Sequence, residues 1–78
     1  MLQPTRELHE RLRRSILRGD WPKGSRGPAL RDLIDIHGLN RSQATLVLEE
    51  LAREGLIVRV QGTGPVIAYT PGQGRAEP

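Results

Sequence analysis

Apolar residues return every four positions near the start of the chain, at Leu8, Leu12 and Ile16. This spacing is typical of a helix that buries one stripe of its surface. Pro4 favours a helix start just before the stripe, and Gly19 supplies a stop after it. We therefore predict a first helix over residues 4–18.

A second, shorter helix is predicted from Pro28, a residue tolerated at the first helical position, to His37. Between the two helices, residues 19–27 break the periodicity and predict a loop, with Trp21 packed over the core. The link from His37 to Asn40 has the length and the glycine of the tight turn in a helix-turn-helix. Helical spacing within the second helix comes from Leu30, Leu33, Ile34 and His37.

The third helix has the clearest start signal in the chain. Asn40 is a good N-cap, and Gln43 three residues later completes a pair resembling a capping box. The helix should end before Gly55. Its core-facing stripe is Ala44, Val47, Leu48, Leu51 and Ala52, which leaves Ser42, Thr45 and Glu49 pointing outward. Leu46 does not belong to the core-facing stripe. It is either a contact for a thymine methyl group, part of a protein interface, or an ordinary exposed leucine, which is the commonest case.

Two short runs, Leu56–Val60 and Pro65–Tyr69, flank the glycine-rich turn Gln61–Gly64 and predict a β-hairpin. Pro65 marks an edge of this hairpin. The predicted fold is therefore α+β: a winged helix-turn-helix with three helices followed by a two-stranded β-hairpin wing. We expect one domain over residues 1–69 and a disordered tail over residues 70–78.

The net positive charge of the chain favours an anionic partner. The net charge is +3, and all 12 basic residues except Lys23 are arginine, whose planar fork suits phosphate and guanine. Base composition in the source genome is an equally good cause of the arginine bias. The third helix has Arg41 in its first turn and Glu49, Glu50 and Glu54 near its end. This order opposes the helix dipole, and a polyanion docked at the N-terminal end would explain it.

Several classes of function are disfavoured. The chain has no cysteine, which excludes disulfides and thiolate metal sites, and we expect no metal or cofactor. His9 and His37 stand alone, and the neighbouring Glu49 and Glu50 diverge on a helix, so we expect no enzyme. The chain has no apolar run long enough to span a bilayer and no signal peptide, which places it in the cytoplasm, associated with the nucleoid.

Residues from about Leu8 to Ile67 resemble the N-terminal winged helix-turn-helix domain of the GntR family of bacterial transcriptional regulators. That family shows a first helix ending near a glycine, a loop running into a Leu-Pro-Ser-Glu-Arg segment, a Ser/Thr-Arg-x-Thr-Val-Arg helix start, a Leu-x-x-x-Gly-Leu step and a Gly-x-Gly wing. The spacing fits without a gap. The corresponding stretches are Ile16–Gly19, Pro28–Arg31, Asn40–Thr45, Leu51–Leu56 and Gln61–Gly64.

The resemblance implies sequence-specific binding of double-stranded DNA, with the third helix in the major groove and the wing in the minor groove. Transcriptional repression is the implied consequence. The DNA-binding residues implied by the resemblance are Arg31, Asn40, Arg41, Ser42, Gln43, Gln61 and Gly62. Thr45, on the outer face of the third helix, and Thr63, at the hairpin tip, are further candidates from their positions. The chain departs from the family at Gly27, at Leu30 and at Thr45, where Leu, Glu and a second arginine respectively are common.

Family members also carry a C-terminal effector-binding and dimerising domain, and the residues after Tyr69 are too few to form one. We therefore expect no small-molecule effector within this chain, and binding as a homodimer on a repeated or palindromic site. The alternative function is a winged-helix protein-interaction module, which would require an apolar patch in place of an arginine-lined surface.

Overall fold

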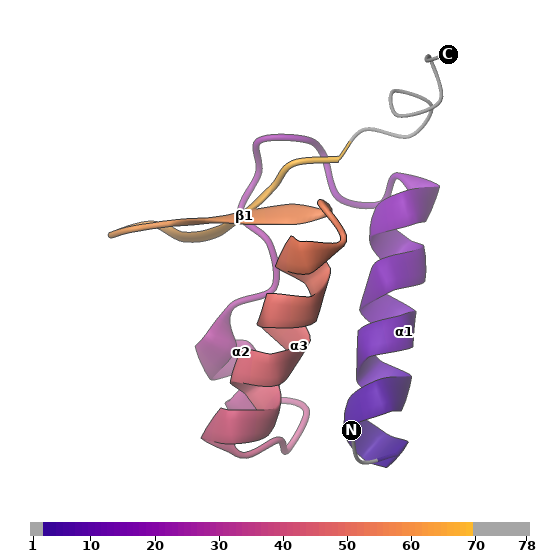
Figure 1. Ribbon diagram of the computed structural model, residues 1–78, viewed down its shortest axis with the longest axis vertical. Coiled ribbons are helices and arrows are strands. Elements are labelled where there is room, and N and C mark those ends of the chain that lie inside the picture. The colour runs from indigo at the N-terminus through magenta and orange to yellow at the C-terminus, as the bar shows by residue number, and fades with distance from the viewer. Residues whose placement is uncertain (1–2, 70–78) are drawn as a thin grey trace.

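Three helices and a β-hairpin make up the computed structural model, which describes residues 3–69. Helix α1 (Gln3–Arg18) buries the predicted stripe of Leu8, Leu12 and Ile16 and packs against α3 (Arg41–Arg53). Figure 1 shows α1 and α3 side by side, with α2 (Leu30–Asp35) on the other side of α3. Helix α3 is thus the central helix, and it contacts both of the others.

The loop that follows α1 is fixed at both ends. Arg18 donates hydrogen bonds to Asp20 Oδ2 at 2.6 and 3.2 Å, and this interaction lowers the pKa of the Asp20 carboxyl group. The Trp21 ring packs against the core, as predicted, and its Nε1 donates to Ser15 Oγ at 2.9 Å. The sequence-based view of residues 19–27 as a plain loop is incomplete, because their last residues pair with the hairpin.

Helix α2 begins later than the sequence predicted. Its N-cap is Ala29, with the extended backbone angles φ −83° and ψ 147°, so Pro28 lies before the helix rather than in its first turn. The helix ends at Asp35, and His37 lies in the turn, where it is exposed. In that turn Gly38 has φ 74°, a left-handed conformation that glycine adopts without strain, and Leu39 is buried. The helix-turn-helix is present, with a shorter first helix.

The structure confirms the predicted start and the predicted core face of helix α3. The Asn40 side chain accepts from the Gln43 backbone N–H at 2.8 Å, and the Gln43 side chain accepts from the Asn40 backbone N–H at 2.9 Å. This is the capping box, and it satisfies two donors at the helix start. The buried residues are Ala44, Val47, Leu48 and Leu51, with Ala52 half-buried.

The hairpin consists of β1 (Ile57–Val60) and β2 (Gly64–Ile67), paired in antiparallel register with Ile57 opposite Ile67. Residues 24–27 pair with the other side of β2 through three backbone hydrogen bonds. These run from Gly24 N to Ile67 O, from Ile67 N to Ser25 O and from Gly27 N to Pro65 O, at 2.8–2.9 Å. Pro65 lies on an edge strand, as expected, because the sheet has two strands, and the segment 24–27 covers part of that edge.

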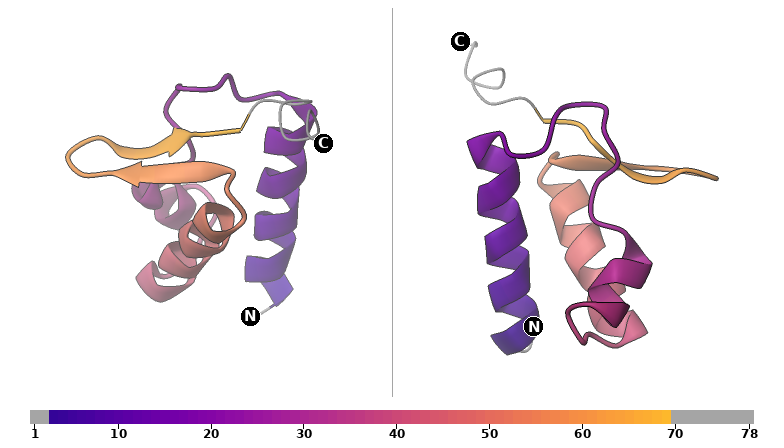
Figure 2. Two further views of the ribbon diagram at one scale, coloured as in Figure 1. Left: turned by 45° about the horizontal axis from the view of Figure 1, so that its top comes forward. Right: turned by 180° about the vertical axis from the view of Figure 1, so that it is seen from behind.

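The tip of the hairpin projects beyond the helices on the side away from α1 (Figure 1, Figure 2). Thr63 N donates to Val60 O at 3.1 Å and closes the turn, in which Gly62 has φ 86°. Ile57, Pro65 and Ile67 are buried, so one face of the hairpin covers the helices. No helix within residues 3–69 is long and apolar enough to cross a membrane. The predicted tail, residues 70–78, lies outside the described residues, and so do residues 1 and 2 of the predicted domain.

Helix α2 has no side-chain cap, and this gives a testable prediction about stability. Ala29 has the extended backbone of an N-cap but no side-chain acceptor. Serine in the same backbone would accept a hydrogen bond from the N–H of residue 31 or 32. We expect Ala29→Ser to raise the free energy of unfolding by about 0.5–2 kcal/mol, and the melting temperature by several degrees.

Thermal denaturation followed by circular dichroism measures this gain. Ala29→Val is the matched control, because it adds apolar bulk at the same position without an acceptor and should give no such gain. A melting temperature for Ala29→Ser at or below that of the wild-type chain would contradict the capping argument.

Candidate nucleic-acid interface

The outer face of α3 forms a shallow hollow, the α3 hollow, opposite its buried stripe. Its lining residues are Arg41, Ser42, Thr45, Leu46 and Glu49. Arg41 and Ser42 are exposed and Thr45 is half-buried, so three predicted site residues share one surface. Leu46 belongs to the same surface and is also half-buried, which places an apolar side chain among polar ones.

Asn40 and Gln43 lie at the start of α3 and are not among the residues that line the α3 hollow. Each side-chain oxygen accepts a backbone N–H in the capping box. Each amide nitrogen remains as a donor, because the capping box uses only the oxygens. The geometry of Asn40 and Gln43 therefore directly supports a role in capping α3. Their two side-chain amide nitrogens remain as hydrogen-bond donors at the start of the helix.

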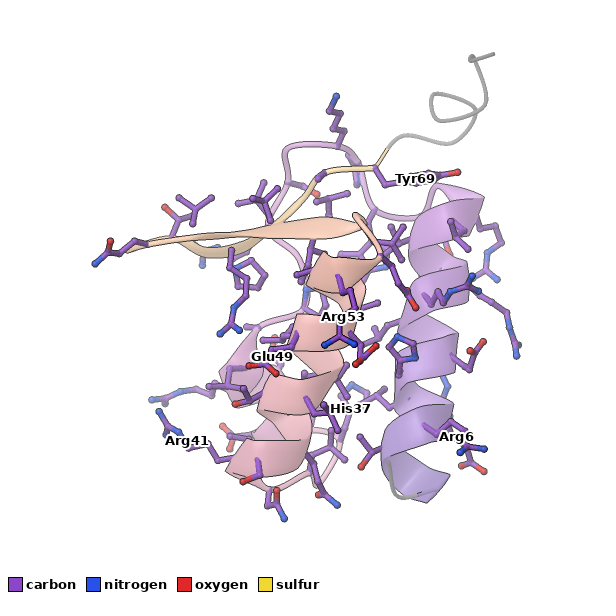
Figure 3. All side chains as sticks on the ribbon, in the orientation of Figure 1. Arg6, His37, Arg41, Glu49, Arg53 and Tyr69 are labelled. Atoms are coloured by element: carbon purple, nitrogen blue, oxygen red, sulfur yellow. The ribbon has the colours of Figure 1, made fainter. Side chains whose placement is uncertain are left out.

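A second hollow, the inter-helix hollow, lies between α2 and the start of α3. Leu30, Arg31, Ile34, Asp35 and Arg41 line it. Arg31 and Arg41 are both exposed and come from different helices, so the fold brings the two predicted arginines to one hollow. Arg41 lines the α3 hollow as well, so it belongs to both surfaces. Figure 3 labels its side chain near the start of α3.

A third hollow, the wing hollow, lies between the hairpin and the helices. Its lining includes Leu48 of α3, Leu30 at the start of α2, Arg26, Ala29 and residues 59–65. The predicted residues Gln61, Gly62 and Thr63 are all exposed here. Because Leu30 also lines the inter-helix hollow, the three hollows form one continuous surface from the outer face of α3 to the tip of the wing.

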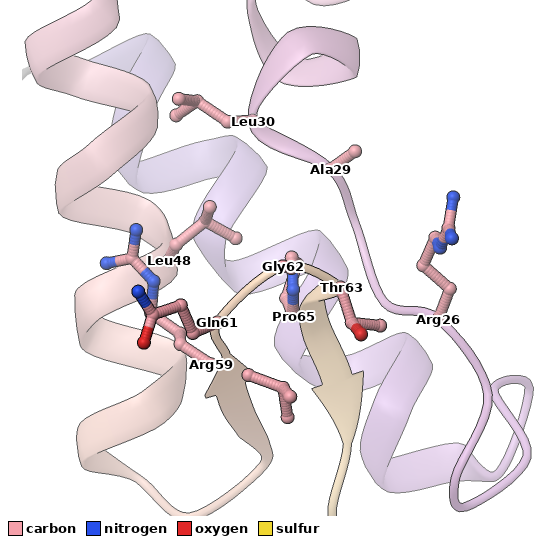
Figure 4. A pocket seen from close by; sticks show the side chains of 11 residues that line it. Arg26, Ala29, Leu30, Leu48, Arg59, Gln61, Gly62, Thr63 and Pro65 are labelled. Atoms are coloured by element: carbon pink, nitrogen blue, oxygen red, sulfur yellow. The ribbon is translucent and has the colours of Figure 1, made fainter.

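Two arginines on this surface were missed by the sequence-based prediction. Figure 4 shows Arg59 and Gln61 extending from the hairpin beside Leu48, whereas Arg26 points away on the opposite side. Arg59 is two residues after the buried Ile57, so strand alternation could have placed it on the helix-facing side. Arg26 had no comparable signal, because its position depends on the pairing of residues 24–27 with β2.

The acids at the end of α3 are neutralised away from this surface. Glu50 contacts Arg53 at 3.1 Å, and Glu54 contacts Arg13 Nε of α1 at 3.3 Å and His9 Nε2 at 3.6 Å. The unfavourable charge order predicted for an isolated helix is therefore offset in the fold by arginines. Glu49 is the exception among these acids, because it lies in the α3 hollow.

Comparison with known proteins identifies the family. The family described as bacterial regulatory proteins, gntR family, matches residues 4–67. The chain belongs to the GntR family. A histidine utilization repressor of Pseudomonas putida is 33% identical over 70 residues, 85% of this chain and 28% of the relative. Its counterpart in Pseudomonas aeruginosa is 38% identical over 58 residues, 74% of this chain and 23% of the relative.

A solved structure extends the GntR assignment to the fold. The crystal structure of AraR(DBD) in complex with operator ORR3 superimposes with a TM-score of 0.77 at 25% identity, covering 87% of this chain and 82% of that chain. The winged helix-turn-helix predicted from the sequence is thereby confirmed. The chain spans only 12% to 28% of the length of the curated GntR-type relatives it matches.

Proposed function

We propose that this chain is the sequence-specific, double-stranded DNA-binding part of a transcriptional repressor. The observation that carries the proposal is the continuous surface formed by the α3, inter-helix and wing hollows. It combines the exposed outer face of a helix, arginines from three elements and a projecting hairpin tip. The relatives named as repressors and the AraR(DBD) structure with its operator support the same function.

In this proposal α3 enters the major groove, which admits one helix, and the hairpin tip reaches the adjacent minor groove. Arg41 and Arg31 donate to guanine or phosphate oxygens, and Arg59 neutralises the backbone between the two grooves. Ser42, Thr45 and the amide nitrogens of Asn40 and Gln43 contribute at the start of α3. Gln61, Gly62 and Thr63 meet the minor groove, where the absence of a side chain on Gly62 permits close approach.

A single module buries only about 600–1,000 Å² on DNA, so specific binding requires two copies on a repeated or palindromic site. The chain would act as a homodimer on DNA, in the cytoplasm at the nucleoid, without an effector site of its own and without enzymatic activity. Repression would follow from occlusion of a promoter.

One observation favours the alternative, a protein-interaction module. Val58 and Val60 are 50% and 43% exposed on the outer face of β1, opposite the face that carries Arg59. Val58 lies outside the three hollows, whereas Val60 also lines the wing hollow, so a protein partner bound to this face would adjoin the surface proposed for DNA. Binding of DNA without any sequence preference would favour this alternative.

Selection from a pool of random duplex DNA tests the proposed function. The purified chain should enrich a repeated motif, and the spacing of the two half-sites should report the geometry of the dimer. Affinity for the enriched duplex should exceed that for unselected duplex at both of two salt concentrations. Weak binding that disappears with salt and enriches no motif would contradict a sequence-specific regulator.

A further inference from the structure

We propose that Glu49 reads a cytosine in the major groove, by accepting a hydrogen bond from the N4 amino group of that base. This inference rests on the proposed function, since it assumes that α3 lies in the major groove. It adds a specificity-determining residue to the surface, and it predicts cytosine at one position in each half-site.

Glu49 lies on the surface that would face the DNA. It is exposed and lines the α3 hollow together with Arg41, Ser42, Thr45 and Leu46. Figure 3 shows Glu49 and Arg41 on the side of α3 away from α1. Residues 41, 45 and 49 are separated by four positions each, so they follow one another along a single face of the helix.

The negative charge of Glu49 is not compensated within residues 3–69, where no ion pair to it occurs. Arg53 is one turn further along α3, but it contacts Glu50 at 3.1 Å. Thr45, one turn earlier, is neutral. Arg41 is eight residues away, about 12 Å along the helix axis, which exceeds the screening length of about 8 Å at physiological salt.

An unpaired carboxylate near the phosphates of DNA is unfavourable unless it gains a hydrogen bond from a base. The hydrogen-bond donors at base edges in the major groove are the amino groups of cytosine and adenine. Adenine presents its N7 acceptor beside the amino group, which repels a second carboxylate oxygen and suits an amide instead. Cytosine presents its amino group without that acceptor, so a carboxylate selects cytosine.

Three chains should be compared in the random-duplex selection: wild type, Glu49→Gln and Glu49→Ala. Gln keeps the shape of the side chain, removes its charge and adds a donor that adenine N7 can accept. We expect wild type to enrich cytosine at one position of each half-site and Glu49→Gln to shift that position toward adenine. In Glu49→Ala, the preference for cytosine over other bases should fall from about tenfold to less than twofold.

Glu10→Gln is the matched control, because it makes the same charge change on α1, outside the three hollows, where the partner of Glu10 is Arg14. It should leave the enriched motif unchanged. Thermal melts of all variants check that they are folded. If Glu49→Ala binds every duplex more tightly and keeps the wild-type motif, Glu49 only repels the DNA backbone and the inference is wrong.

An unchanged motif and unchanged affinity in Glu49→Ala would remove this residue from the interface, which also overturns the inference. These outcomes differ from failure of the proposed function. If the proposed function fails, the wild-type chain itself enriches no motif. The Glu49 variants then have no wild-type sequence preference to be compared with.

Discussion

Replacing Arg41 by alanine is expected to lower the affinity for the selected duplex by about 5- to 150-fold, equivalent to about 1–3 kcal/mol. Arg41 is the first residue of α3, is exposed, and lines both the α3 hollow and the inter-helix hollow. Its guanidinium group can donate two parallel hydrogen bonds to O6 and N7 of guanine. Titration of labelled duplex, followed by fluorescence anisotropy at several salt concentrations, measures the loss.

The dependence on sequence and salt separates two roles for Arg41. If it reads a base, Arg41→Ala should lose discrimination at one position of the half-site. If it contacts only phosphate, the loss should be similar on all duplexes, and the slope of log affinity against log salt should fall by about one. Arg14→Ala removes the same charge from α1, outside the three hollows, and serves as the control. Equal losses in both variants would show that only net charge matters.

The start of α3 was predictable because its signals are local. Asn40 and Gln43 are three residues apart, and each bonds to the backbone of the other, so the sequence alone contains the whole capping box. The periodic stripes on α1 and α3 were predictable for the same reason. In a helix, side chains four residues apart share a face, and this does not depend on contacts with the rest of the chain.

The start of α2 was not predictable, because a distant part of the chain decides it. Pro28 suits a first helical position locally. In the fold, however, Gly27 N donates to Pro65 O at 2.9 Å, and the helix begins only after its N-cap Ala29. This pairing joins residues almost 40 positions apart, and no local pattern signals it.

The same pairing accounts for Gly27, where the sequence departs from the family. Gly27 is buried, and a Cβ atom there would lie 3.3 Å from Ile67 Cδ1 and 3.7 Å from Ile57 Cγ2. The isoleucines of the hairpin therefore already occupy the space beside residue 27. The sequence showed this departure, but only the arrangement of residue 27 beside the hairpin gives it a physical reason.

The candidate site shows the same division between local and long-range information. Helix spacing predicted that Ser42, Thr45 and Glu49 share the outer face of α3, and they do line one hollow with Arg41. The continuity of that face with the wing depends on Leu30, which lines two of the hollows. Contacts between α2, α3 and the hairpin set this continuity, and the sequence does not reveal it.

Leu51→Ala should have the largest effect on stability, lowering the free energy of unfolding by about 2–5 kcal/mol. Leu51 is 0% exposed and lies in the core that joins α1, α3 and the hairpin. Alanine is the best helix former, so the loss reports the cavity and the lost apolar contacts rather than helix propensity. A domain of this size is only marginally stable, and we expect a large unfolded fraction at 37 °C.

Urea denaturation measures the loss of stability in Leu51→Ala, and added DNA then links stability to function. Ile36→Ala also removes apolar atoms, but from a side chain that is 70% exposed, and should change the free energy of unfolding by less than about 0.5 kcal/mol. The selected duplex at 100 times its dissociation constant should restore about 2.7 kcal/mol to Leu51→Ala, because it binds only the folded chain. A scrambled duplex at the same concentration should restore much less. Equal rescue by both duplexes would mean that the surface binds DNA without reading its sequence.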